Sequence, residues 1–85
     1  MNPSYDIAIW EVDIKKWRAL QQIEDRVERF TAYLEIEPEK IWAEKHPFIP
    51  RKGEQIQIDH SAYEVVIVAY DLGDDHIRLL VVKLR

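Results

Sequence analysis

Two stretches of the chain decide its fold: YEVVIVAY at residues 63–70 and IRLLVVKL at residues 77–84. Both are almost wholly apolar and rich in valine, isoleucine and leucine, a composition typical of β-strands. The segment between them contains Asp and Gly residues, which favour a turn, so we expect an antiparallel hairpin. In each stretch the residues of both parities are apolar. This pattern indicates that both faces of the hairpin are covered, because a sheet with one solvated face alternates apolar and polar residues.

Two further segments alternate with period two and predict strands. Residues 55–59 alternate through Ile56 and Ile58, and residues 5–10 through Tyr5, Ile7 and Ile9. The phase of the first segment shifts at Ile9 and Trp10, where we expect either a bulge or the end of the strand. Short Asp- and Ser-containing turns join the three later strands, so these should form an antiparallel meander.

A long amphipathic helix is predicted between the first strand and the meander. Asp13 is a good N-cap, because its carboxylate can accept from the free amides of the first turn. Pro38 disfavours helical geometry at the preceding residue, so the helix of about six turns should end near residues 34–36. Its apolar face combines spacings of three and four residues: Leu20, Ile23, Val27, Phe30 and Leu34. Pro38 can also begin a second, short helix over residues 39–45.

The expected fold class is therefore α+β, with the chain order β-α-α-β-β-β. A four-stranded, mainly antiparallel sheet carries one long amphipathic helix on one face. The 85 residues form a single domain, 1–85. The neighbour of the first strand within the sheet stays open.

Composition limits the class of protein. Hydrophobic residues make up 47% of the chain, which argues against disorder. Twelve Lys and Arg against sixteen Asp and Glu give a net charge of −4, which disfavours a general nucleic-acid binder. The longest apolar run, residues 65–70, is far shorter than the ~20 residues of a membrane span. No signal-peptide pattern is visible at the start, so we expect a cytoplasmic protein without a membrane partner.

One feature of the pattern indicates a partner. A single helix covers one face of the sheet, and leaving about six large side chains of the other face in water would forgo on the order of 10 kcal/mol. Three covers are open: the segment around residues 39–49, a curl of the sheet into a small barrel, or another copy of the chain. The last option makes the second face a candidate protein interface, formed by Trp10, Val66, Val68, Tyr70, Leu80, Val82 and Leu84.

The sequence indicates no catalytic, cofactor or metal site. His46, His60 and His76 are 14 and 16 residues apart, without zinc-helix spacing. Cysteine is absent, and the two glycines are isolated, so no thiolate site or glycine-rich phosphate loop is indicated. The expected function is therefore a small non-enzymatic protein–protein interaction module that self-associates or belongs to an assembly.

The order of strand, two helices and meander is similar to that of RelE/ParE-type toxins, and the resemblance lies in this order alone. It implies a ribonuclease or gyrase-directed effector with a basic concave sheet. The candidate residues for such a nucleic-acid-directed alternative are Arg51, Lys52, His76 and Arg78. Residues 50–85, a turn followed by a tight meander, are also similar in their order of elements to small SH3-like barrels. Neither resemblance carries a motif.

Overall fold

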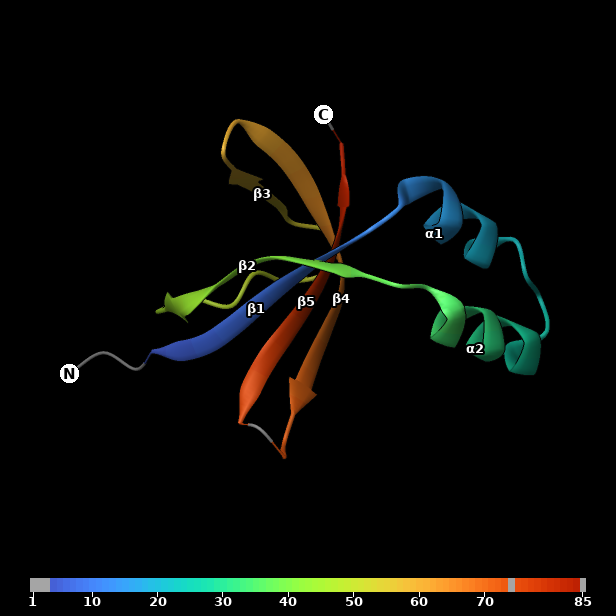
Figure 1. The fold of residues 1–85 in the computed structure, drawn as a ribbon, viewed down its shortest axis with the longest axis horizontal. Coiled ribbons are helices and arrows are strands. Elements are labelled where there is room, and N and C mark those ends of the chain that lie inside the picture. Colours follow the sequence, from blue (N-terminus) through green and yellow to red (C-terminus); the bar gives the residue numbers. More distant parts are fainter. Residues whose placement is uncertain (1–3, 74, 85) are drawn as a thin grey trace.

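The computed structural model describes residues 4–73 and 75–84. It is an α+β fold in which a mixed five-stranded sheet curls and two helices lie together at one end of it (Figure 1). The strand order is β2-β1-β5-β4-β3. The elements are, in chain order, β1 Tyr5–Val12, α1 Ile14–Gln21, α2 Arg26–Glu35, β2 Glu39–His46, β3 Gln55–Ile58, β4 Ser61–Asp71 and β5 His76–Lys83.

The predicted meander is confirmed, and β5 lies at the centre of the sheet. It pairs antiparallel with β4 and parallel with β1. The sheet is therefore mixed, with three antiparallel pairs and one parallel pair, and it has five strands rather than the four expected. Leu79 and Val81 of β5 are completely buried on one face, and Leu80 and Val82 are buried on the other, as expected for a strand with apolar residues of both parities. Asp59 and His60 join β3 to β4, and both have positive φ, which is the backbone geometry that favours a two-residue hairpin turn.

The predicted short helix at residues 39–45 is wrong, because this segment is strand β2. It pairs antiparallel with β1, with Trp42 opposite Ile9 and Ala43 opposite Ala8. An unpaired β1 would leave a row of backbone donors and acceptors open at the sheet edge. Pairing satisfies them and packs Ile41 and Trp42 against the core. Tertiary pairing therefore outweighs the local preference for a helix after Pro38.

The single long helix is also wrong, because the chain breaks it into α1 and α2. The Asp13 cap is confirmed: its side chain accepts from the amides of Lys15 and Lys16. Asp25 then caps a second helix and accepts from the amides of Val27 and Glu28. The Arg29 side chain donates to the Ile23 carbonyl at 2.6 and 2.9 Å. These local bonds satisfy backbone groups that a continuous helix would have paired with each other.

Both faces of the sheet carry a buried cluster. The concave cluster consists of Ile7, Ile9, Tyr63, Val65, Ile77, Leu79 and Val81, and side chains from β2, β3 and the loop at residues 47–54 pack against it. The convex cluster consists of Val12, Val66, Leu80 and Val82. Trp17 of α1 and Tyr33 of α2 pack against this second cluster. The curl of the sheet and the helices thus cover the two apolar faces within one chain.

A bulge in β4 decides which face its side chains occupy. Val65 lies opposite Val81 and Ile67 lies opposite Leu80, so Val66 is the extra residue between them. Val66 and Ile67 therefore both join the convex cluster, and Val68 returns to the concave one. A bulge of one residue reverses the parity of every position that follows it.

Candidate functional site

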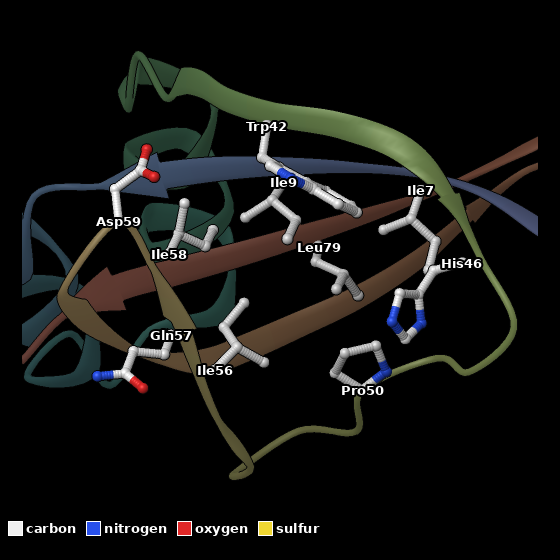
Figure 2. Close-up of a pocket in the computed structure, with 10 residues that line it drawn as sticks. All are labelled: Ile7, Ile9, Trp42, His46, Pro50, Ile56, Gln57, Ile58, Asp59 and Leu79. Atoms are coloured by element: carbon white, nitrogen blue, oxygen red, sulfur yellow. The ribbon is translucent and has the colours of Figure 1, made fainter.

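The curled sheet encloses a half-open cavity of about 480 Å³ on its concave face, and most of the residues that line it are apolar. Figure 2 shows its lining, which comes from the edge strands β2 and β3 as well as from β1 and β5. Ile9 and Leu79 form its floor, and Trp42, Ile56 and Ile58 stand around them. β2 and β3 occupy opposite ends of the strand order. The cavity is the space that remains because these two edges do not pair to close a barrel.

The polar groups of this lining stand at its two ends. His46 is at one end, beside Pro50, and Asp59 is at the other, where the Gln57 side chain points away from the cavity (Figure 2). The His46 Nδ1 atom lies 2.9 Å from the Phe48 carbonyl oxygen and 3.1 Å from its amide nitrogen. The ring is therefore tied to the loop through Nδ1, which leaves Nε2 to contact another group.

The described lining of the cavity holds few groups of the kind that take part in catalysis. Its described residues include no serine, threonine or lysine that could act as a nucleophile, and its histidine and its carboxylate stand at opposite ends. General acid–base catalysis needs such groups within hydrogen-bond reach of one reacting centre. Among residues 4–73 and 75–84, no group of three His, Asp or Glu side chains is placed to hold a metal ion. Within the same ranges, no lysine or arginine lines the cavity, so its described lining offers no side chain of fixed positive charge for an anion.

Helix α2 carries a second candidate site, a stripe of exposed apolar side chains. Val27 is 75% exposed, Phe30 62% and Leu34 65%. These three residues, called the α2 stripe below, are spaced by three and four positions and so follow one side of the helix. Tyr33 packs against the convex cluster instead. No residue of α2, which the structure describes in full, is buried, so the helix is anchored at the edge of the fold by a few contacts.

The third feature is a basic and aromatic group on the convex face. Trp10 lies opposite Leu80 of β5 and Lys40 of β2. The Lys40 ammonium and the Arg78 guanidinium each lie 5.4 Å from the centre of a Trp10 ring, within the range of a cation–π interaction. The indole Nε1 is buried and has no hydrogen-bond partner in the part of the chain that the structure describes.

The residues predicted as an interface do not form one surface. Val66, Leu80 and Val82 are buried under the helices, so the need for an external cover does not apply to them. Val68 lies on the concave side because of the bulge. The others are Trp10, which is half-buried, Tyr70, which is 65% exposed, and Leu84, which is 39% exposed.

The residues of the nucleic-acid alternative are also separated. Arg51 and Lys52 belong to the loop at residues 47–54, which bonds to β4 at Val65, opposite Val81. His76 and Arg78 lie three to five positions before Val81 on β5, a separation of roughly 10–16 Å along the strand. The Arg78 guanidinium lies over Trp10.

Comparison with protein-family models, with curated proteins and with solved structures finds no match to this chain. Neither described helix is long and apolar enough to cross a membrane.

Proposed function

We propose that this protein is a small non-enzymatic interaction module that self-associates through the α2 stripe. The observation that supports it most is the exposure of Val27, Phe30 and Leu34, each at least 62% exposed on one side of a ten-residue helix. Apolar residues scattered singly over a surface are ordinary, whereas a contiguous apolar patch is typical of an interface.

A second copy of the chain matches the chemistry of the stripe. Spacings of three and four residues are those of the a and d positions that interlock between paired helices. A two-fold dimer brings the same patch of both copies together. Phe30 of each copy would therefore pack against the α2 stripe of the other copy. The rest of the helix surface is strongly charged, with Arg26, Glu28, Arg29 and Glu35, and would form a solvated rim.

The size of the stripe predicts a weak dimer. Full burial of a large apolar side chain is worth about 1.5–3 kcal/mol, so six side chains that are about two-thirds exposed give roughly 6–12 kcal/mol. Association costs about 4–15 kcal/mol in lost freedom. The difference is at most about 8 kcal/mol, which corresponds to a dissociation constant of about 1 µM, and a difference of about 4 kcal/mol corresponds to about 1 mM.

Sedimentation velocity over this concentration range tests the proposal. The wild-type chain should shift from monomer to dimer, and Phe30→Asp should remain monomeric because it puts a charge at the centre of the interface. Leu72→Asp is the matched control, since Leu72 is 93% exposed and lies outside the stripe. A wild-type chain that stays monomeric, or a Phe30→Asp chain that still dimerises, contradicts self-association through α2.

A nucleic-acid-directed activity is the second candidate, favoured by Trp10 together with Lys40 and Arg78. Aromatic rings with neighbouring cations are typical of single-strand binding surfaces. A salt-sensitive gel shift of single-stranded RNA that Arg78→Ala abolishes would support it. The net charge of −4 favours the interaction module.

The cytoplasm is the compartment we propose on the sequence alone, and cell fractionation tests it.

A further inference from the structure

We infer that the cavity on the concave face binds an uncharged, largely apolar small molecule about the size of two or three aromatic rings. This binding is independent of self-association, because the cavity and the α2 stripe share no described residue. Three features support it: the size of the cavity, the chemistry of its lining and the nature of the strand edges beside it.

The size fits a small ligand. Binding pockets for small molecules commonly span about 300–1,000 Å³, and this cavity measures about 480 Å³. An engineered apolar cavity of about 150 Å³ takes up one benzene molecule. The present cavity is about three times larger, which is the basis for the proposed two to three rings.

The lining favours an occupant that is largely apolar and carries no negative charge. Ile7, Ile9 and Leu79 are buried at its floor, and Trp42 supplies an aromatic surface (Figure 2). Among the described residues, no lysine or arginine lines the cavity to neutralise an anion. His46 and Asp59 stand at opposite ends, where they can hydrogen-bond to one or two polar atoms of the ligand without breaking up the apolar centre.

The strand edges beside the cavity disfavour a protein strand as the occupant. Half of the eight residues of β2 are charged, namely Glu39, Lys40, Glu44 and Lys45. Charged side chains on an edge strand oppose the addition of a further strand. β3 on the opposite side has only four residues, which offers few backbone groups for pairing. A small molecule needs neither edge.

The neutral three-ring dye N-phenyl-1-naphthylamine, which brightens in apolar surroundings, is the probe. Titrations use the Phe30→Asp background, so that the α2 stripe cannot capture the dye. We expect saturable binding of one dye per chain. Ile58→Trp, which fills the cavity from β3, should weaken binding at least about tenfold. The matched control Leu72→Trp adds the same ring at an exposed turn and should change binding less than about twofold.

Methyl NMR on the same sample locates the dye without a cavity mutation. Shifts at Ile9, Leu79 and Ile58, with Val27 and Leu34 unmoved, support the site. Circular dichroism of Ile58→Trp shows whether that variant keeps its fold, and Ile56→Phe replaces it if not. The inference is overturned if dye binding does not saturate, or if the folded cavity-filling variant binds the dye as tightly as the parent chain. It is also overturned if the dye shifts only methyl signals of the helices.

Discussion

Replacing Leu79 with alanine should cost about 2–5 kcal/mol of the free energy of unfolding. Leu79 is completely buried at the centre of β5, with Ile9 beside it on β1 and Val68 on β4. Truncating a buried leucine removes its transfer free energy and leaves a void that rigid strands fill only in part. A chain of 85 residues has a total stability of roughly 4–13 kcal/mol. The substitution therefore removes a large share of it.

Urea unfolding followed by tryptophan fluorescence measures this cost. With a slope of about 1–1.5 kcal/mol per molar urea, the midpoint should fall by roughly 1.3–5 M while the slope stays unchanged. Leu72→Ala makes the same chemical change at a site that is 93% exposed, and should stay within about 0.5 kcal/mol of wild type. Equal losses in the two variants would refute the assignment of β5 to the centre of the core.

Two further predictions concern the backbone. Gly53 has φ of +90°, and a Cβ added there would meet no described atom within 4 Å. Gly53→Ala should therefore cost about 1 kcal/mol in urea unfolding through backbone strain alone. Gly73→Ala is its control, because the added Cβ meets only an ordinary contact at 3.4 Å, and equal costs in the two variants would contradict the strained backbone at Gly53. Asp25→Ala should remove the cap of α2 and speed the amide hydrogen exchange of that helix. Global stability should change little, because no residue of α2 is buried. In contrast, Asp13→Ala should lower global stability by about 1 kcal/mol, since α1 carries the buried Leu20. A larger global loss in Asp25→Ala than in Asp13→Ala would show that α2 is part of the cooperative core.

The meander could be predicted from sequence because its signal is local. Residues 63–70 and 77–84 are apolar on both parities, and such segments have few alternatives to a doubly covered strand. Both faces of the sheet are indeed covered, as that pattern requires. Which segments cover each face depends on the curl of the sheet and on the placement of α1. Neither of these produces a periodic pattern in the sequence.

The two errors arose where tertiary contacts outweigh local preference. Residues 39–46 have no clear period, and their pairing with β1 along the whole segment makes them a strand. Leu20 and Phe30 follow one helical period in the sequence, but the Asp25 cap divides that period between two helices. Asp25 is the one signal that could have shown the break, since aspartate often begins a helix.

The cavity was missed for the same reason. Its lining combines Trp42 with Ile56 and Ile58, and these strands lie at opposite ends of the sheet. No pattern in the sequence says that two edge strands face each other across a curl. The α2 stripe, in contrast, was visible as apolar spacing, but its exposure required knowledge of the break at residues 22–25.

The most direct test of self-association is sedimentation velocity of the wild-type and Phe30→Asp chains, at concentrations from about 1 µM to 1 mM. The wild-type sedimentation coefficient should rise with concentration towards that of a dimer, while Phe30→Asp stays at the monomer value throughout. If the two chains sediment alike at every concentration, the α2 stripe does not bind a second copy and the proposed function is wrong.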